Sequence, residues 1–459
     1  MPPKRHLVTI SESLAMHSSS TDWPEVSVSD VVERHFCGPS PDCEERRIFD
    51  DGEWGVLKTT AITWSGWNEE AHKVLPRAYW GQTGIEVHAG DVLVTKAGPR
   101  QRVGVVTHVP STRRQLVVSG KMIALRPRTS LVLPEILAGL LALPTPQKFI
   151  HDRTTGMAES QVNFANDVLL NAPLRIPPMA DQLEIARIGT ALDTTIRETE
   201  AIIEKLKLVK EGLLHDLLTR GIDANGELRP PQSQAPHLYK DSPLGWIPKA
   251  WAPHVLGQVL TGGTRNGLYK PSSFHGSGPL MVQMGGMFRG DAVDFQSATR
   301  VRVTRPELNA FGLEVGDLLF ARRSLTFEGA GQCAIVRDLP EASTFESSIV
   351  RARVDRSRVE PEFAALFLRG ALSSTHRRTL IRQVAVSGVS SDDIQHFLIA
   401  LPDLTEQAAI IGAIASAQGR IEQEATEVRK LSLQKSGLMD DLLTGRVRVT
   451  PLLDANSAP

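Results

Sequence analysis

Residues 210–219 read KEGLLHDLLT, and residues 435–444 read KSGLMDDLLT. The two stretches lie 225 positions apart. Extended backwards without gaps, the match becomes a 46-residue segment, in which residues 177–222 align with residues 402–447 at the same offset. Because a repeat of this length reflects the architecture of the whole chain, it decides the fold before any single motif does.

The similarity continues upstream of these segments in weaker form. GIEVHAGDVLVTKAG (84–98) resembles GLEVGDLLFARRS (312–324), and WPEVSVSDVV (23–32) resembles WAPHVLGQVL (251–260). The offset drifts by only a few residues, as surface loops of different length would produce. The chain of 459 residues therefore consists of two diverged halves. Each half has a globular unit of roughly 150 residues, a usual domain size, followed by one strongly patterned segment.

The patterned segments have the apolar periodicity of long helices. Each opens with Pro and an acidic first turn and closes at a glycine, which are typical helix boundaries. A heptad ladder over about four heptads predicts a coiled-coil-like seam. The ladder comprises Leu192, Ile196, Ile203, Leu206, Leu213 and Leu217 in the first copy and Ile414, Ala417, Ile421, Val428, Leu431, Leu438 and Leu442 in the second.

Helices of this length need a partner for the seam. A helix of about 40 residues is about 60 Å long, which exceeds the width of a small domain. The other copy, packed antiparallel with pseudo-twofold symmetry, is the economical partner. A coiled coil between two chains is the alternative.

Four residues do not fit a simple apolar seam. Lys210 and Lys435 occupy seam positions, and Gly212 and Gly437 lie two residues further on inside each helix. Glycine in a helix interior costs roughly 1 kcal/mol relative to alanine. The glycines indicate either close packing or a local bend, or they are residues inherited through the duplication.

The globular units contain short β-branched runs bounded by turn residues, which predict strands, and a helical stretch that begins with Pro-Glu. The expected fold class is α+β, with two similar mixed α/β domains joined by two long antiparallel helices. The predicted parts are an N-terminal tail (1–20), a first domain (21–176), a first helix (177–220), a Pro- and Gly-rich linker (221–247), a second domain (248–401), a second helix (402–446) and a C-terminal tail (447–459).

The composition excludes several classes of protein. Hydrophobic residues make up 41% and charged residues 22% of the chain, as in ordinary globular proteins. No apolar run reaches the roughly 18 residues of a membrane helix, and the N-terminus lacks the apolar core of a secretory signal. The three cysteines are too few for a disulfide framework, which favours a cytoplasmic location. Cys37 and Cys43 lie near His35, but no second ligand pair follows at zinc-like spacing, so no metal site is predicted.

Catalytic motifs are missing from the sequence. It has no phosphate-binding loop, no Gly-x-Ser-x-Gly elbow, no His-Glu-x-x-His and no Asn/Asp-Pro-Pro-aromatic motif of methyltransferases. This absence from both diverged copies favours a binding protein over an enzyme.

Among the features of the sequence, the basic residues indicate a binding function most clearly. The net charge is −1, but residues 245–400 contain 18 Lys and Arg against 14 Asp and Glu. Lysine and arginine contact phosphates, and arginine can also read guanine in the major groove. A solvated strand face with alternating charge is the alternative. The candidate DNA-binding residues are Lys96, Arg100, Arg102, Arg113, Arg114, Arg265, Lys270, Arg289, Arg322 and Arg323.

Several of these patterns together resemble one family. The duplicated endings are KLKLVKEGLLHDLLTRGI and KLSLQKSGLMDDLLTGRV, and the openings PPMADQ and PDLTEQ are similar to a Pro-Pro-Leu-x-Glu-Gln element. GDVLVTKAG and GDLLFARRS look like a Gly-Asp-hydrophobic-Leu strand in each half, and YKDSPLGWIPKAW (239–251) looks like an entry into a second half. With these motifs the chain resembles, from about residue 20 to 450, the specificity (S) subunits of type I restriction–modification systems. The first half departs from the family pattern at Met179-Ala180-Asp181.

The resemblance implies a function without catalysis. Each globular unit would be a target recognition domain that reads one half of a bipartite site in double-stranded DNA. The long helices would act as spacers and dock two modification (methyltransferase) subunits, and restriction (translocating endonuclease) subunits would join that core. S-adenosylmethionine, ATP and Mg²⁺ would be used by these partners, and no cofactor is expected in this chain.

The sequence adds two expectations and leaves two alternatives. Divergence between the units predicts different half-sites and hence an asymmetric target. Charged residues on the exposed helix faces, such as Lys205, Lys207, Arg429 and Lys430, alternate with apolar ones and are suited to binding partner helices. The alternatives are the recognition subunit of a type IIB-like system and a coiled-coil scaffold with no nucleic-acid role.

Overall fold

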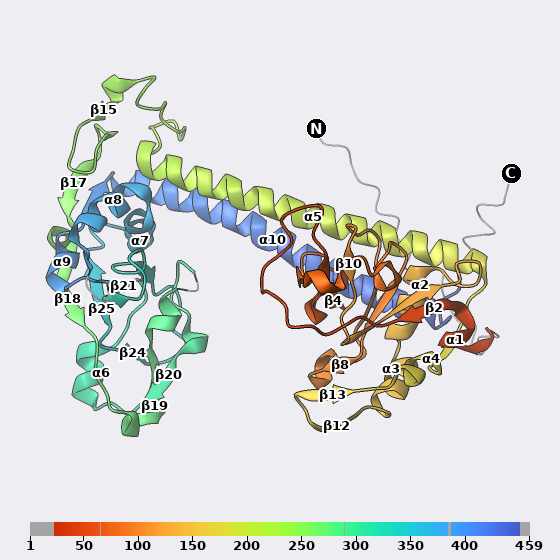
Figure 1. Ribbon diagram of the computed structural model, residues 1–459. Helices are drawn as coiled ribbons and strands as arrows, with labels where there is room; N and C mark the ends of the chain where they lie inside the picture. Colours follow the sequence, from red (N-terminus) through yellow and green to blue (C-terminus); the bar gives the residue numbers. More distant parts are fainter. Residues whose placement is uncertain (1–22, 65, 289, 384–386, 450–459) are drawn as a thin grey trace. The chain divides into compact units, whose positions relative to one another are not determined.

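The computed structural model describes residues 23–449, except 65, 289 and 384–386. The chain forms two compact units, of which unit 1 comprises residues 1–199 and 427–459 and unit 2 comprises residues 200–426. The divisions fall inside the two long helices, α5 (Met179–Arg220) and α10 (Leu404–Leu443) (Figure 1). Each unit therefore combines one globular domain with one part of each helix.

Unit 1 is built on a four-stranded antiparallel sheet with the order β2–β11–β7–β9. A second sheet has the order β10–β3–β6, a third has the order β12–β13–β8, and β1 pairs with β14 and β4 with β5. The strands are β1 (Glu25–Ser27), β2 (Val32–Phe36), β3 (Gly55–Leu57), β4 (Ile62–Thr63), β5 (Gly66–Trp67), β6 (His72–Val74), β7 (Val92–Thr95), β8 (Ala97–Gly98), β9 (Val106–His108), β10 (Leu116–Val117), β11 (Met122–Pro127), β12 (Thr155–Ala158), β13 (Gln161–Asn163) and β14 (Pro173–Arg175). The shorter helices are α1 (Val28–Val31), α2 (Pro134–Ala142), α3 (Pro144–His151) and α4 (Asn166–Leu170).

Unit 2 is built on the corresponding sheet, with the order β18–β25–β21–β23. Its other sheets have the orders β20–β19–β24 and β22–β27–β26, and β15 pairs with β16 and β17 with β28. The strands are β15 (Tyr239–Lys240), β16 (Ile247–Pro248), β17 (Ala252–Val255), β18 (Leu260–Asn266), β19 (His275–Val282), β20 (Thr299–Val301), β21 (Leu318–Ala321), β22 (Arg323–Ser324), β23 (Cys333–Ile335), β24 (Ser343–Phe345), β25 (Ile349–Val354), β26 (Arg382–Gln383), β27 (Ser387–Gly388) and β28 (Leu398–Leu401). The shorter helices are α6 (Arg305–Phe311), α7 (Pro361–Arg369), α8 (Ala371–Leu380) and α9 (Ser391–Gln395).

The two globular domains repeat one topology. The central sheets have matching strand orders and are antiparallel throughout. In the second sheet of each unit, the central strand has one parallel and one antiparallel neighbour. β3 pairs parallel with β10 and antiparallel with β6, and β19 pairs parallel with β24 and antiparallel with β20. The predicted fold of two similar mixed domains and two long antiparallel helices is confirmed, although only fragments of this repeat were visible in the sequence.

The end of each long helix is anchored in a globular domain. In unit 1, Leu442 and Leu443 of α10 are 3% exposed and belong to the domain core. In unit 2, Leu217 and Leu218 of α5 are 3% exposed in the core of that domain. The repeated Asp-Leu-Leu-Thr sequence is therefore the segment by which each helix docks, and each helix ends on the domain of the other half-chain.

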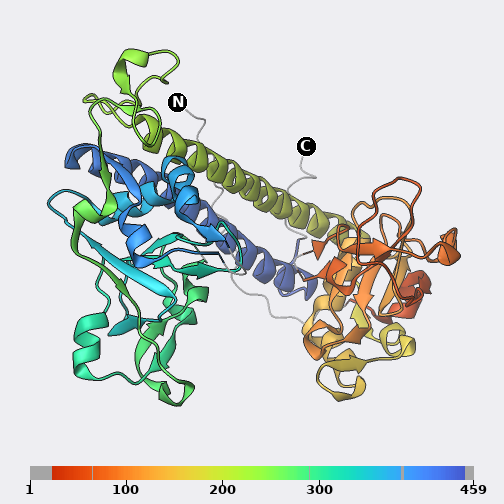
Figure 2. The same ribbon diagram turned by 60° about the vertical axis from the view of Figure 1, so that its left-hand side comes forward.

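Local sequence explains these boundaries. A Cβ atom at Gly139 of α2 would lie 2.6 Å from Cδ1 of Leu443, so a larger residue there would force this leucine to move away from its position against α2. Gly221 and Gly445 follow the helix ends with φ of 66° and 69°, the left-handed conformation that stops a helix. Within each unit, the α5 and α10 segments lie side by side and antiparallel (Figure 2).

Candidate nucleic-acid interface and helix joints

The Gly-Asp pair shared by both halves forms a turn at the start of β7 and of β21. Gly90 has a φ of 91°, and its counterpart in unit 2 has a φ of 93°. Asp91 and Asp317 are each 1% exposed. Asp91 accepts two hydrogen bonds from Arg126 (2.8 and 2.9 Å), and Asp317 accepts two from Arg353 (2.6 and 3.2 Å). This motif fixes the strands that lead to the basic candidates and does not itself offer charge to a ligand.

Lys96 and Arg322 occupy equivalent places after these strands. The backbone N–H of Lys96 donates to the carbonyl of Lys121 (2.8 Å), as that of Arg322 donates to Ser348 (2.9 Å). Their side chains differ, because Lys96 Nζ donates to Asn166 Oδ1 at 2.7 Å. Within the described part of the chain, the Arg322 guanidinium has no hydrogen bond or ion pair, so its charge is available to a ligand.

The candidates that follow Lys96 are engaged inside unit 1. Arg100 forms an exposed ion pair with Glu159 (2.8 Å). Arg102 donates to the carbonyls of Thr59 and Ile62 (2.5 and 2.8 Å), so its guanidinium holds the β4–β5 hairpin. Arg100 can exchange its surface partner for a phosphate at low cost, whereas Arg102 is structural.

Arg113 and Arg114 form a separate group, between β9 and β10. They line a pocket of about 350 Å³ together with residues 86–89 and 112. The backbone N–H of Arg113 donates to Glu69 (3.0 Å). Arg114 is exposed and, among the residues described, its side chain has no charged partner.

Two unit 2 candidates gather around α6. The Arg265 guanidinium lies 5.4 Å from the ring centre of Phe311. Lys270 Nζ lies 2.7 Å from Glu307 and 4.9 Å from the ring centre of Phe274. The hydrogen bond from Lys270 lowers the pKa of Glu307 to about 2, so the carboxylate neutralises Lys270 at any pH near neutrality.

One of the two remaining candidates lies on β22. Arg323 is exposed on this strand, and Arg289 lies outside the described residues. Sequence reasoning missed Arg378, which lies 5.7 Å from the ring centre of Phe327 and 3.6 Å from Glu328. It comes from α8, some 50 residues further along the chain than its neighbours, so no local pattern could have indicated it. The basic candidates therefore form separate groups in each domain.

The predicted seam residues are buried to different degrees, and Leu217, Ile414 and Leu442 belong to domain cores instead of a seam between the helices alone. Leu217, Ile414, Ile421 and Leu442 are buried, and Leu438 is 37% exposed. The half-buried members are Leu192, Ile196, Ile203, Leu206, Leu213, Ala417, Val428 and Leu431.

The seam lysines reach across to the opposite helix. Lys435 Nζ lies 2.5 Å from Asp193 Oδ1 in unit 1, and Lys210 Nζ lies 2.8 Å from Gln418 Oε1 in unit 2. Shifted by the repeat offset of 225, each pair becomes the other. The lysines therefore serve the helix crossing in both copies.

A duplicated glutamine joins each helix start to its domain. Gln182 is 1% and Gln407 0% exposed. Gln182 Oε1 accepts the N–H of Leu133, the residue before α2, at 2.9 Å, and Gln407 Oε1 accepts that of Glu360, the residue before α7, at 2.8 Å. Each amide also donates to a proline carbonyl five residues earlier (2.9 Å in both). Both glutamines thus satisfy buried backbone groups that would otherwise lack partners.

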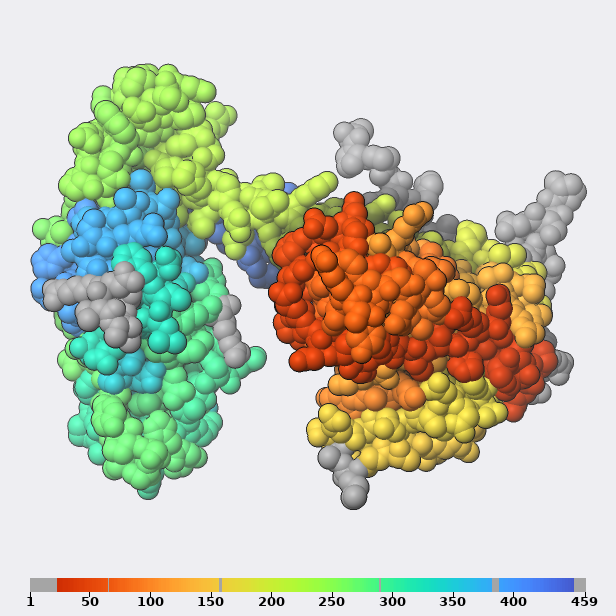
Figure 3. Space-filling model, in the orientation of Figure 1, coloured from red at the N-terminus to blue at the C-terminus, as the bar shows by residue number. Residues whose placement is uncertain are grey.

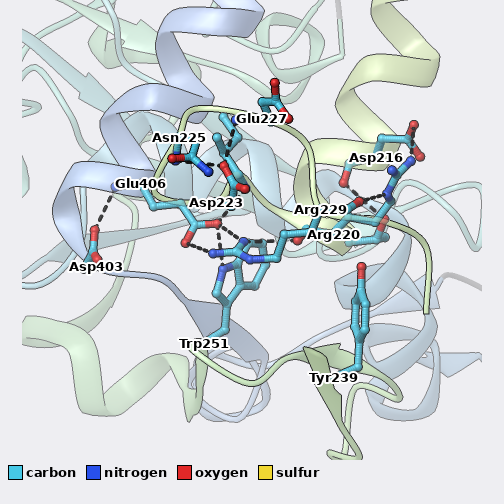
Figure 4. Close-up of polar contacts among 12 residues, drawn as sticks. Asp216, Arg220, Asp223, Asn225, Glu227, Arg229, Tyr239, Trp251, Asp403 and Glu406 are labelled. Atoms are coloured by element: carbon cyan, nitrogen blue, oxygen red, sulfur yellow. Dashed lines mark hydrogen bonds and ion pairs between the residues drawn. The ribbon is translucent and has the colours of Figure 1, made fainter. Parts of the chain in front are cut away.

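In unit 2 a polar clamp closes the joint between α5 and the domain (Figure 4). Glu406, in the first turn of α10, accepts hydrogen bonds from Arg229 (2.5 and 2.9 Å) and from the indole N–H of Trp251 (3.0 Å). It also accepts the backbone N–H of Ile222, just past the end of α5 (2.8 Å). The carboxylate raises the pKa of Arg229, so this pair stays charged.

The equivalent joint in unit 1 has different polar contacts. Trp23 takes the place of Trp251, and Arg448, which follows α10, lies 5.3 Å from its ring centre. Asp181 takes the place of Glu406 and is 7% exposed. Across residues 23–449, apart from the undescribed positions, Asp181 has no ion pair and the buried Trp23 indole N–H has no acceptor.

Two further findings concern membrane helices and metal ligands. No helix in the described ranges is both long and apolar enough to cross a membrane. In the same ranges, no group of three or more His, Cys, Asp or Glu side chains is arranged to hold a metal ion. Cys37, Cys43 and Cys333 are free thiols, and burial raises the pKa of the Cys333 thiol to about 12.

Known proteins show where this architecture occurs. No protein-family model matches the chain. It is 32% identical over 203 residues to the type I restriction enzyme EcoEI specificity subunit of Escherichia coli, a match that covers 43% of this chain but only 33% of that protein. It is 23% identical over 343 residues to the type I restriction enzyme MjaVIII specificity subunit of Methanocaldococcus jannaschii, covering 73% of this chain and 75% of that protein. The chain is therefore similar to specificity subunits of type I restriction enzymes, although it matches only about a third of the length of the first of these relatives.

A solved structure shares the fold of this chain. Its TM-score is 0.57 at 17% sequence identity, and the match covers 94% of this chain and 100% of the other. That structure was determined in work on complex assembly and conformational transition of the type I R-M system. In the present chain, the residues that carry the resemblance have structural tasks: the Gly-Asp pair braces a strand, the glutamine binds the backbone before a helix, and the Leu-Leu ending docks a helix.

Proposed function

We propose that this chain is the specificity subunit of a type I restriction–modification system and reads a bipartite, asymmetric site in double-stranded DNA, one half with each globular domain. The helices fix the spacing of the half-sites and dock two modification subunits, to which restriction subunits are added. S-adenosylmethionine, ATP and Mg²⁺ are used by those partners, and this chain performs no catalysis.

The observation that carries the proposal is the repetition of one domain topology with different exposed side chains. Two copies of one scaffold suit a ligand that offers two similar surfaces, and duplex DNA offers its groove again after one helical turn, ~34 Å. Among the candidates that the structure describes, those with no charged partner inside the chain differ between the copies. Unit 1 presents Arg114, whereas unit 2 presents Arg322 and Arg323 after β21. Phosphate contacts of this kind position a protein on DNA, and side chains that differ between the domains select different bases.

The test is to map methylation in a host that carries this chain with its modification subunit. We expect one motif with two specified parts separated by a fixed number of unspecified base pairs. Replacement of residues 21–176 by the same domain of another specificity subunit should change one part only. Methylation that persists without this chain would contradict the proposal, as would a change in both parts of the motif.

A second measurement separates reading from catalysis. The purified chain, mixed with duplex DNA, S-adenosylmethionine, ATP and Mg²⁺, is expected neither to methylate nor to cut it. With the modification subunit added, a gel shift should appear and weaken as salt rises. A missing shift at low salt would favour a coiled-coil scaffold, and cleavage on both sides of the site by the modification complex would identify a type IIB-like system.

A further inference from the structure

One large apolar side chain in unit 2 stands almost entirely in solvent beside two arginines. Leu325, which follows β22, is 94% exposed, more than any other exposed large hydrophobic residue in the described part of the chain. Arg322 and Arg323 precede it, and neither guanidinium has a hydrogen bond or ion pair to a described residue. Because an apolar side chain stabilises a fold only where it is buried, the fold itself does not explain this leucine.

The backbone around Leu325 is fixed, so its exposure is part of the structure. Ser324 Oγ accepts a hydrogen bond from the backbone N–H of Thr326 (3.1 Å), which makes a serine turn with Leu325 at its tip. β22 pairs with β27 just before this turn. A Cβ atom at Gly329 would lie 2.2 Å from Ser324 Oγ, so the rest of the loop closes against the turn. The loop therefore holds Leu325 outward at a defined place.

The residues that follow Leu325 in the loop have partners inside the domain. Phe327 is half-buried, and the Arg378 guanidinium lies 5.7 Å from its ring centre and 3.6 Å from Glu328. Leu325 and the two arginines before it are thus the part of this segment to which the described residues offer no partner. Teal atoms of this segment are uncovered on the face of unit 2 that Figure 3 shows.

The equivalent loop of unit 1 has no such side chain. Gly104 and Gly331 mark the same place in the two loops, since each donates its N–H at 2.8 Å to the strand before the loop. Between Lys96 and Gly104 the sequence reads AGPRQRV, whereas between Arg322 and Gly331 it reads RSLTFEGA. Val103 of the first loop is 1% exposed. The two domains therefore present different chemistry at the same position of one scaffold.

We propose that Leu325 contacts the C5-methyl group of a thymine in the half-site that unit 2 reads. The inference rests on the proposed function and names one residue that selects a base. Arg322 and Arg323 suit the phosphates on either side of a groove, and the tip of the loop then reaches the base edges.

The chemistry of the base edges selects thymine. In the major groove, thymine alone among the four bases presents an apolar group. The amino and carbonyl groups of the other bases would lose water against a leucine and gain no partner, which is unfavourable. The half-site of unit 2 therefore contains a specified A·T pair, and the loop of unit 1 makes no contact of this kind.

The experiment uses the full chain in complex with its modification subunit and duplexes that carry the mapped site. The half-site of unit 2 is the part of the motif that stays when residues 21–176 are exchanged. Each thymine of that part, on either strand, is replaced in turn by uracil, which lacks only the methyl group. At one position we expect the affinity to fall about 4-fold, as the loss of one buried methyl group implies.

A variant of the leucine then links this effect to the loop. Leu325→Ala should bind the thymine duplex more weakly by a similar factor and should no longer distinguish thymine from uracil at that position. A merely structural role would not remove this discrimination, and the melting temperature should stay unchanged because the side chain is exposed. Val315→Ala is the matched control, since Val315 is 51% exposed but precedes β21, at the other end of the strand. It should keep the full effect of uracil.

The outcomes separate this inference from the proposed function. A unit 2 half-site without a specified A·T pair, tolerance of uracil at every position, or discrimination that persists in Leu325→Ala would overturn the inference alone. If Leu325→Ala instead weakens binding of the modification subunit and keeps the discrimination, the leucine serves a protein contact and the inference is wrong. If the unaltered complex does not bind the duplex at all, the proposed function fails as well.

Discussion

The two joints between helix and domain share their apolar contacts and differ in their polar ones. In unit 1, Leu442 and Leu443 dock into a domain whose entry residue is Trp23. In unit 2, the equivalent leucines dock beside Trp251, which is 0% exposed. Only unit 2 adds the clamp on Glu406, with its ion pair to Arg229.

The difference shows which contacts of the helix–domain joint both copies have kept. Burial of two leucines depends on shape and area and survives in both copies. The clamp needs a charge from another segment, and Arg229 comes from the linker after α5. The segment after α10 supplies Arg448, which lies over the Trp23 ring instead. We infer that the leucine dock is the common anchor of the fold and that the polar contacts are specific to each joint.

The largest effects are expected from the shared anchor. Leu217→Ala and Leu442→Ala should each lower the free energy of unfolding of their own unit by about 2–5 kcal/mol, because each leaves a cavity in a core. Hydrogen exchange of β21 and β7 amides would report the two units separately. Leu208→Ala, on the exposed side of α5, is the control and should change stability by less than about 0.5 kcal/mol. A large loss in one unit only would show that the two docks are not equivalent.

The next largest effect should distinguish the helix–domain joint of unit 2 from that of unit 1. Glu406→Ala leaves Arg229 and the Trp251 indole N–H without an acceptor in a largely buried place, and it should destabilise unit 2 by about 2–4 kcal/mol. Asp181→Ala should cost unit 1 less than about 1 kcal/mol, mainly through the favourable position of a carboxylate near a helix start. Urea unfolding, followed through hydrogen exchange of the same β21 and β7 amides, would test both expectations. Equal losses in both units would mean that Asp181 has a charged partner after all.

Much of this fold could be predicted from the sequence, because the repeat of residues 177–222 at 402–447 is long and without gaps. The heptad ladder predicted two long helices with an apolar seam, and the similarity of the two halves predicted their antiparallel pairing. The domain to which each Leu-Leu ending docks could not be predicted, since the contact joins residues far apart in the chain. The sequence also could not separate candidates without a described partner, such as Arg322, from candidates that are bonded inside their domain, such as Arg102. This distinction depends on loop conformations, which a periodic pattern does not encode.

A smaller effect is expected where equivalent residues have different partners. Arg322→Ala should lower the salt slope of DNA binding by the complex by about 1, as the loss of one phosphate contact does. Lys96→Ala should lower it by less, because Lys96 already donates to Asn166. Arg300→Ala is the control, because its guanidinium makes three hydrogen bonds within the domain, two to Glu341 (2.7 and 3.0 Å) and one to the carbonyl of Gly278 (2.8 Å), and it should leave the slope unchanged. Unchanged salt slopes for Arg322→Ala and Lys96→Ala would place both residues outside the DNA interface. If either variant instead loses specificity for one half-site, the replaced residue reads a base.

The smallest effects should come from the seam lysines, where the two units differ by a single charge. Lys435 faces the carboxylate of Asp193, and their side chains are 31% and 48% exposed, whereas Lys210 faces the neutral amide of Gln418. Lys435→Met should therefore cost less than about 1 kcal/mol, since water screens the pair. A double-mutant cycle with Asp193→Ala should give a coupling that falls between 0.05 and 0.5 M salt, as screening of roughly 10 Å at 0.1 M implies. The matching cycle of Lys210→Met with Gln418→Ala should give a weaker coupling that salt does not change. If both coupling energies respond to salt alike, Lys210 also interacts with a negatively charged residue in unit 2. The comparison of the two units would then have to include the acidic residues around Lys210.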